Sequence, residues 1–291
     1  MTPSLQRLSG TGGGGDGVAW ARLAAIVSRH SAELSAPPPD ARGLCWSCRG
    51  PVRQGHARCF QCEYHEAVLP GLLPDIVVPI AYAPKGSVLA RSLWMYKSGA
   101  VAGQSGRRGP PGAPAADRAR VLLGALLVTF LRRHLRCVIR AAGGGRPSHV
   151  AVVPSGRSRP GCHPLLAMAG SLVRLPQAEL SLNDRDGTGA RLVSVERYRA
   201  GRLAGADVLL LDDTWTTGAS CCSAAAALKA AGARSVAVVV IGRHIGPVVP
   251  GQPRAGRALA AVPDGGATGD GPFSPRAMPF RAGICAAHQT W

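Results

Sequence analysis

The sequence predicts an α/β protein whose central sheet is mainly parallel. Three observations lead there: short apolar runs of strand length, segments of helical composition between them, and one clear strand–loop–helix–strand unit near the end of the chain. The apolar runs are Ile76–Tyr82, His149–Val153, Val208–Leu211 and Ser235–Ile241. In sheets of this kind ligands bind at the carboxyl ends of the strands, so the residues that follow each run are the candidates for function.

Residues 1–40 are expected to form a flexible leader. Met1–Gly17 is rich in glycine and lacks the basic-then-apolar order of a signal peptide, so we expect a cytoplasmic protein. A short helix is expected over Val18–Leu34. The run Ala36–Pro39 then marks a linker, because proline cannot extend a helix.

Residues 44–66 are predicted to form a small zinc ribbon. Two Cys-x-x-Cys pairs can each supply two thiolates, and together they complete a closed tetrahedral Zn²⁺ site with a structural role. The four cysteines are Cys45, Cys48, Cys59 and Cys62. His56 and His65 lie nearby, but four thiolates already saturate zinc, so both are expected to be bystanders. The alternative is a pair of disulfides, which a cytoplasmic location disfavours.

Residues 70–245 are expected to form the main domain. After its first strand, a helix is expected over Val88–Tyr96, and the Gly/Pro-rich stretch Gly99–Ala115 is predicted to be a mobile loop. Ala116–Ala142 has arginines flanking an apolar centre, which predicts a core-packing helix with solvated ends. Further on, a short strand is expected over Arg191–Val195.

A first anion-binding loop is predicted after the strand His149–Val153. This strand runs into a turn rich in glycine, serine and arginine, and a helix expected over His163–Leu175 follows. Guanidinium groups can bridge phosphate oxygens through forked hydrogen bonds. The candidate residues are Ser155, Gly156, Arg157, Ser158 and Arg159.

The most informative stretch begins with the strand Val208–Leu211. Two adjacent acids, Asp212 and Asp213, follow, and a loop of hydroxyl residues and glycine leads into a helix expected over Cys221–Ala231. Such a loop presents unpaired N–H groups and the positive end of the helix dipole to an anion. Its candidates are Thr214, Thr216, Thr217, Gly218, Ala219 and Ser220. Carboxylates beside a phosphate site suit a ligand that also carries hydroxyls or a divalent cation; the alternative is an ordinary strand–turn–helix with a threonine cap.

This stretch, Val208–Ser220, resembles the phosphoribosyl pyrophosphate (PRPP) binding motif of type I phosphoribosyltransferases. The resemblance implies the type I phosphoribosyltransferase fold, with Mg²⁺ bound together with PRPP. It implies that Asp212 and Asp213 are the catalytic pair that holds the ribose 2′- and 3′-hydroxyls. It further implies that Thr214–Ser220 wraps the 5′-phosphate and that Ser155–Arg159 holds the pyrophosphate.

The order of a four-cysteine ribbon, a lysine-bearing helix and this domain resembles the ComF family, which is associated with competence and DNA uptake. The resemblance covers Leu44–His244. ComF relatives usually continue the pyrophosphate loop with an Arg-Gly-Phe-Asn-Gln type of segment, whereas this chain has Arg159-Pro-Gly-Cys-His163. Trp94, Tyr96 and Lys97 fall near an aromatic and lysine-bearing segment of the relatives.

Two functions follow from these resemblances. In the first, a phosphoribosyltransferase, a nitrogen nucleophile displaces pyrophosphate at C1 of PRPP, a reaction that depends on positioning and on stabilising the leaving charge. The sequence leaves the acceptor open. In the second, the chain binds PRPP without catalysis and handles nucleic acid, with single-stranded DNA or another anionic molecule as its partner.

Charge and hydropathy constrain these alternatives. The formal net charge is +18, but only three of the 34 basic residues are lysines, and the arginines are spread along the chain. This pattern favours scattered solvated arginines over one basic surface for an anionic partner. The longest apolar run, Val121–Leu131, falls short of the roughly 20 residues that span a bilayer, so no membrane insertion is expected. Residues 246–291 form a Pro/Gly-rich tail in which Cys285 and His288 are a weak metal-binding pair.

Overall fold

The computed structural model describes most of the chain between residues 15 and 245. The described residues are 15–38, 43–53, 55–98, 113–144, 147–154, 165, 168, 175–183 and 192–245. The helices are α1 (Gly15–Arg29), α2 (Phe60–Val68), α3 (Val88–Ser98), α4 (Ala113–Ala141) and α6 (Ala219–Ala230), with 3₁₀ turns η2 (Ser31–Glu33) and η4 (Val195–Arg197). The strands are β1 (Ile76–Pro84), β2 (His149–Val152), β3 (Leu180–Leu182), β4 (Tyr198–Ala200), β5 (Asp207–Trp215) and β6 (Ser235–Ile245).

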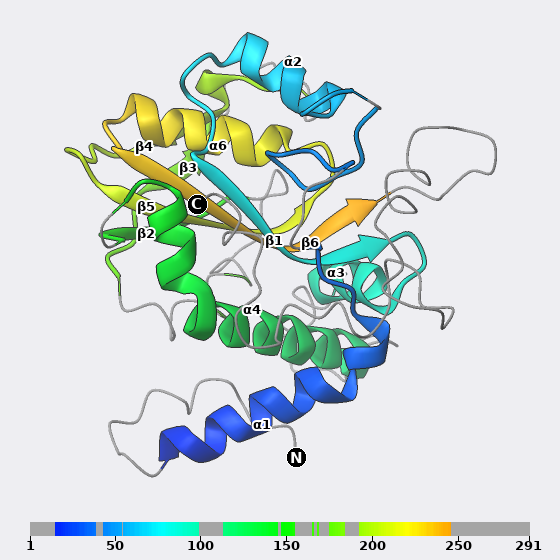
Figure 1. The fold of residues 1–291 in the computed structure, drawn as a ribbon. Helices are drawn as coiled ribbons and strands as arrows, with labels where there is room; N and C mark the ends of the chain where they lie inside the picture. Colours follow the sequence, from blue (N-terminus) through cyan, green and yellow to red (C-terminus); the bar gives the residue numbers. More distant parts are fainter. Residues whose placement is uncertain are drawn as a thin grey trace.

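Four strands form a parallel sheet in the order β1-β6-β5-β2 (Figure 1). This confirms the predicted mixed α/β class with a parallel central sheet. Strand β5 is longer than the predicted Val208–Leu211, because it continues through both acids to Trp215 and stays paired with β6 as far as Arg243. Its apolar composition ends at Leu211, but its pairing does not.

Helices cover both faces of the sheet, with α2 and α6 on one side and α1, α3 and α4 on the other (Figure 1). Successive side chains of a strand face opposite sides. In β5, Leu209 and Leu211 pack in the core that contains α4, whereas Val208 and Leu210 pack in the core that contains α6. Burial on both faces explains why the strand is a continuous apolar run.

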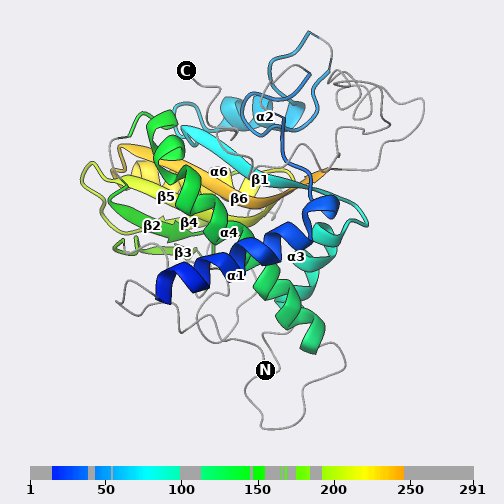
Figure 2. The ribbon, with the colours of Figure 1, turned by 60° about the horizontal axis from the view of Figure 1, so that its bottom comes forward.

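The first described helix, α1, packs against α4 and crosses it, as two views show (Figures 1 and 2). Leu23 and Val27 are buried in the core that α4 helps to form. On the same helix, the Trp20 ring lies 4.8 Å from the Arg132 guanidinium carbon, at cation–π distance. Residues 15–38 of the expected leader therefore contribute to the packed domain.

The strand predicted over Arg191–Val195 is wrong for the residues that the structure describes. Leu192, whose side chain is half exposed, lies in a bend, and Val195 begins the 3₁₀ turn η4. Ser194 precedes this turn and accepts a hydrogen bond from the Glu196 amide, which fixes a cap instead of an extended strand. The strands present in this region are β3 and β4, which form an antiparallel pair.

Several predicted features lie outside the described residues. They are the turn Ser155–Arg159, residues 99–112 of the predicted loop, most of the helix expected over His163–Leu175, and the tail 246–291 with Cys285 and His288. The other predicted helices of the main domain are confirmed to within a few residues at each end, as α3, α4 and α6.

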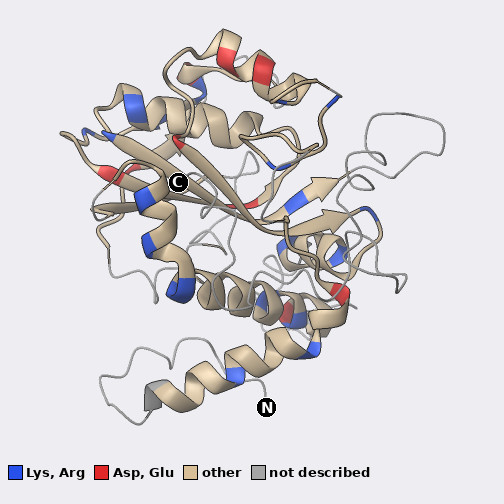
Figure 3. Cartoon of the chain, in the orientation of Figure 1, with Lys and Arg blue, Asp and Glu red and all other residues tan. Residues whose placement is uncertain are grey.

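Basic residues are distributed over several elements of the described chain (Figure 3). Helix α4 carries six arginines, helix α6 carries Lys229, and strand β6 carries Arg243. Among the described helices, none combines the length and the apolar composition needed to cross a bilayer.

Candidate functional site

The acid pair lies at the carboxyl end of β5, where its side chains face opposite layers. Asp212 is paired in register with Val240 of β6, and the strand continues past Asp213 to Trp215. Because neighbouring residues of a strand alternate, Asp213 faces α3 and Asp212 faces α6. The two acids expected to act together therefore meet different partners in this structure.

Asp213 is buried and is held by two residues at the end of α3. The Lys97 ammonium donates to Oδ1 at 2.8 Å, and the Tyr96 hydroxyl donates to Oδ2. The Lys97 side chain remains 41% exposed, so its charged end is accessible from solvent. Helix α3 reaches this position because residue 242 of β6 is glycine: a Cβ on Gly242 would collide with Leu93 of α3.

Asp212 is half-buried and receives two hydrogen bonds. The Cys221 thiol donates to Oδ2 at 3.0 Å, and the Asp213 amide donates to Oδ1 at 2.8 Å. Burial, followed by the negative charge of Asp213, raises the pKa of Asp212 to about 7. Burial and the Asp212 carboxylate also raise the pKa of the Cys221 thiol well above its usual value, so Cys221 stays a hydrogen-bond donor. Asp212 is therefore a carboxyl group that changes charge near neutral pH.

The β5–α6 loop (residues 216–218) joins the acid pair to the N-terminus of α6. Gly218, the residue before the helix, has a φ of +90°, in the left-handed region that favours glycine. A Cβ on Gly218 would also collide with the Trp215 ring. Thr217 accepts a hydrogen bond on Oγ1 from the Ala219 amide at 3.4 Å. The loop therefore brings hydroxyl groups and the positive end of the α6 dipole next to the acids.

Trp215, the last residue of β5, lies against this loop, because its ring is next to Gly218. Its side chain is only 1% exposed and packs in the core that contains α6. It also lines a pocket of about 220 Å³ between the ribbon, β1 and α6, together with His65 and Cys222. In the described part of the chain, the Trp215 Nε1 atom has no hydrogen-bond partner.

The expected pyrophosphate loop begins beside this site, although Ser155–Arg159 themselves lie outside the described residues. Strand β2 pairs with β5, and the Val153 amide donates to the Leu211 carbonyl oxygen at 3.0 Å. Leu211 is the residue before Asp212. Val153, two residues before the expected pyrophosphate loop, therefore lies next to the residue that precedes the acid pair.

The four cysteines of the ribbon lie in one cluster that can hold a metal ion. All four sulfur atoms lie within 4.8 Å of one another, and the Sγ atoms of Cys48 and Cys59 are 3.7 Å apart. Tetrahedral thiolates at about 2.3 Å from zinc are about 3.8 Å apart, so the spacing fits a four-thiolate zinc site. A glycine-bearing turn supplies Cys45 and Cys48. Cys59 is the cap residue that precedes α2, and Cys62 lies in the first turn of that helix.

The two histidines of the ribbon are not part of this cluster. His56 is exposed, and its Nδ1 lies 3.2 Å from Glu63 Oε1. His65 is fully buried, and burial lowers its pKa to about 4, which favours the neutral ring. Among the described residues, only the four cysteines form a group that could hold a metal.

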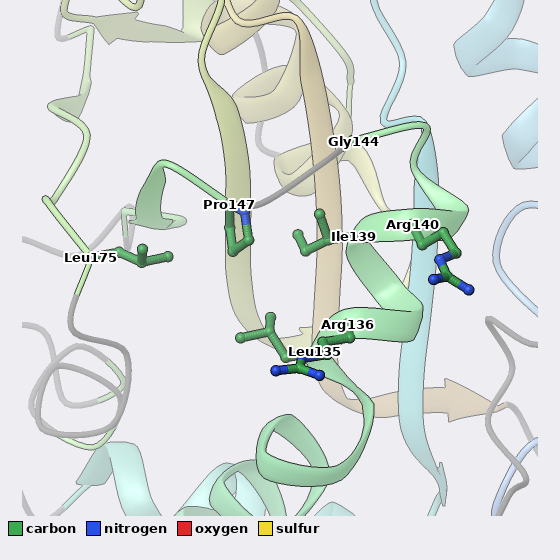
Figure 4. Close-up of a pocket in the computed structure, with 7 residues that line it drawn as sticks. All are labelled: Leu135, Arg136, Ile139, Arg140, Gly144, Pro147 and Leu175. Atoms are coloured by element: carbon green, nitrogen blue, oxygen red, sulfur yellow. The ribbon is translucent and has the colours of Figure 1, made fainter.

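A second pocket among the described residues, about 830 Å³, lies at the opposite end of the sheet. Figure 4 shows Ile139, Pro147 and Leu175 around it, with the Arg140 guanidinium pointing away from them. Gly144, also in its wall, is close to Ser235 at the amino end of β6. Because parallel sheets bind ligands at their carboxyl ends, the surroundings of Asp212 and Asp213 are the candidate site.

Three features define this protein as a class: a parallel central sheet, helices on both of its faces and an N-terminal four-cysteine cluster. Comparison of the chain with protein-family models and with curated proteins found no match.

Proposed function

We propose that this chain is a ComF-like protein with a type I phosphoribosyltransferase fold that binds PRPP at the carboxyl end of β5. One observation carries the proposal: the acid pair, the β5–α6 loop and the Lys97 cation meet at one edge of a parallel sheet. A sugar phosphate needs hydroxyl acceptors beside a phosphate site, and this edge offers both within one continuous stretch of chain.

The proposed roles follow from the chemistry of each group. The 5′-phosphate binds at the N-terminus of α6, where the loop hydroxyls and amides are available as donors. Asp213 and Asp212 accept hydrogen bonds from the ribose hydroxyls. Lys97, already beside Asp213, can turn its exposed ammonium toward the pyrophosphate. In this proposal the Ser155–Arg159 turn, which follows β2, completes the pyrophosphate site.

Mg²⁺ fits this proposal only when PRPP is bound at the same time. Asp212 and Asp213 face opposite layers, so they do not form a shared cation site by themselves. Magnesium in such enzymes is typically bound by one or two carboxylates together with substrate phosphates. When bound with PRPP, it would supply positive charge to the pyrophosphate as that group leaves.

The transfer reaction asks the protein mainly for position and charge. A bond forms between the acceptor nitrogen and C1 as the bond from C1 to the pyrophosphate oxygen breaks, and pyrophosphate leaves with the electron pair. Lys97 would stabilise the charge that develops on this leaving group. The α6 N-terminus and the two acids would hold the ribose so that C1 stays aligned with the acceptor.

The four-cysteine cluster is proposed to hold a structural zinc ion. Four thiolates close the coordination shell, which leaves no position for a substrate or water. The residues that would hold the ion are Cys45, Cys48, Cys59 and Cys62.

Calorimetric titration of the zinc-loaded protein with Mg²⁺–PRPP tests the proposal. We expect micromolar binding that Asp213→Asn abolishes and that Asp117→Asn, on the exposed surface of α4, leaves unchanged. A folded wild type that binds no PRPP would contradict the proposed function.

The same preparation separates the two functional alternatives. Release of pyrophosphate with a defined base or amine identifies a transferase. PRPP binding without release, together with salt-dependent binding of single-stranded DNA, identifies the non-catalytic ComF-type alternative.

A further inference from the structure

Arg243 connects the four-cysteine cluster to the β5–α6 loop. It lies near the end of β6 and is only 8% exposed, which is unusual for arginine. Its Nε donates to the Cys48 carbonyl oxygen at 3.2 Å, and its Nη2 lies 3.5 Å from the Cys48 sulfur. Its Nη1 donates to the carbonyl oxygens of Trp215 at 3.2 Å, Thr216 at 3.0 Å and His244 at 2.6 Å. One guanidinium therefore binds both segments.

At the cysteine cluster, the positive Arg243 guanidinium lies next to a group that would be negatively charged with metal bound. Four thiolates around one divalent cation leave a net negative charge, and a buried negative charge needs a partner. Arg243 supplies that partner next to Cys48, in the outer shell that orients metal ligands. The ribbon leaves room for it because residue 50 is glycine: a Cβ on Gly50 would collide with the Arg243 guanidinium.

The loop side of the contact fixes the direction of the backbone. In a planar trans peptide the N–H of the next residue points opposite to the carbonyl oxygen. Since the carbonyl oxygens of Trp215 and Thr216 point to Arg243, the amides of Thr216 and Thr217 point away from it. These two residues lie in the loop proposed to bind the 5′-phosphate, so Arg243 determines which way its donors face.

We infer that Arg243 is a positioning residue through which metal in the four-cysteine cluster sets the phosphate affinity of the β5–α6 loop. The inference rests on the proposed function, since it names the determinant of that same phosphate site. With the metal bound, Cys48 is fixed and holds the guanidinium, which holds the loop carbonyls. Without the metal, the Cys48 end of this contact is no longer fixed. Coupling of this kind is reciprocal, so phosphate binding must tighten metal binding by the same factor.

The test measures metal affinity by chelator competition, with and without PRPP, at constant Mg²⁺. In the wild type we expect PRPP to tighten zinc binding about tenfold, a typical coupling between two sites. Arg243→Met should retain one metal per chain and lose this effect. Arg234→Met is the matched control, because that arginine pairs with Asp207 at the other end of the sheet.

Cobalt substitution adds a spectroscopic readout that activity does not provide. We expect PRPP to shift the thiolate–cobalt absorption of the wild type and of Arg234→Met, and to leave the spectrum of Arg243→Met unchanged. If Arg243→Met does not fold, Gly50→Ala replaces it: this change displaces the guanidinium and leaves every ligand and donor in place. Full coupling in a folded Gly50→Ala or Arg243→Met protein would overturn the inference.

The outcomes separate this inference from the proposed function. If the metal-loaded wild type binds no PRPP, the proposed function fails. If it binds PRPP but the affinity for zinc is the same with and without PRPP, the function stands and the role of Arg243 is refuted.

Discussion

Lys97 Nζ lies 2.8 Å from Asp213 Oδ1, although 116 residues separate the two in the chain. The end of α3 brings the cation to the carboxylate, and Tyr96 completes the contact. In the free protein the buried charge of Asp213 is therefore already compensated. In the proposed function, ligand hydroxyl groups that donate to Asp213 in place of the Lys97 ammonium would release Lys97 for a phosphate.

Loss of Lys97 should weaken PRPP binding. A hydrogen bond to a charged group contributes about 1.5–3 kcal/mol, so Lys97→Ala should lower the affinity for Mg²⁺–PRPP roughly 10- to 100-fold by calorimetry. Lys229→Ala is the matched control. The Lys229 ammonium donates to Asp75 at 2.9 Å, and this ion pair does not involve Asp212 or Asp213. Equal affinities of the two variants would remove Lys97 from the site.

Gly218→Ala should destabilise both the fold and the site. The residue has a φ of +90°, and an added methyl group would also collide with the Trp215 ring. A non-glycine residue in a strained conformation costs about 1–3 kcal/mol, and the collision adds to that cost. Gly86→Ala is the control for conformation alone, since Gly86 has a φ of +88° with open space around its Cα. Urea denaturation should show the larger loss for Gly218→Ala; equal losses would mean that the Trp215 contact is unimportant.

Asp212 should make stability depend on pH in a direction opposite to that of most carboxylates. Its pKa is raised from 3.8 to about 7, so the folded protein keeps a proton that the unfolded chain releases between these values. The stabilisation of the folded state by this protonated carboxyl group is fully present below pH 4 and is lost as the pH rises through 7. Asp212→Asn should therefore be more stable than the wild type at pH 8, by roughly 1–3 kcal/mol, and not at pH 4. Parallel pH profiles of the two proteins in denaturation experiments would contradict the raised pKa.

Removal of the metal should destabilise the ribbon first. Structural zinc contributes a large part of the folding free energy in small metal-binding modules. Cys48→Ser should lose zinc by elemental analysis and lower the thermal midpoint by several degrees. Cys137→Ser, which changes a half-buried cysteine on α4, should keep the zinc content and the thermal midpoint of the wild type. Retention of one zinc per chain by Cys48→Ser would exclude a four-thiolate site.

The parts of the fold that the sequence predicts are the long segments of uniform composition, such as strands in which nearly every residue is apolar. Strands β5 and β6 are buried on both faces, and their apolar composition shows it. The segment from Leu192 to Val195 has a similar local composition, but only Val193 is fully buried and Leu192 is half exposed. Composition alone does not separate these two cases, and strands of three residues such as β3 are too short to show any alternation.

The residues of the candidate site also fall into two groups: those that the sequence indicates and those that only the folded structure reveals. Asp212, Asp213 and Gly218 occur within one short stretch, so their order in the sequence indicates them. Lys97 and Arg243 reach the site only through the packing of α3 and the register of β6, which no local pattern encodes. Before the structure, only the resemblance to an aromatic and lysine-bearing segment of the ComF family drew attention to Tyr96 and Lys97.

The strand order β1-β6-β5-β2 has a consequence for synthesis of the protein. The last described strand to leave the ribosome, β6, is the one that joins β1 to β5, so the sheet stays in two separate parts until β6 emerges. Contacts between such distant segments form slowly, and the unpaired edges of β1 and β5 are exposed meanwhile. The four cysteines precede β1 and emerge early, so they can come together before the sheet is complete.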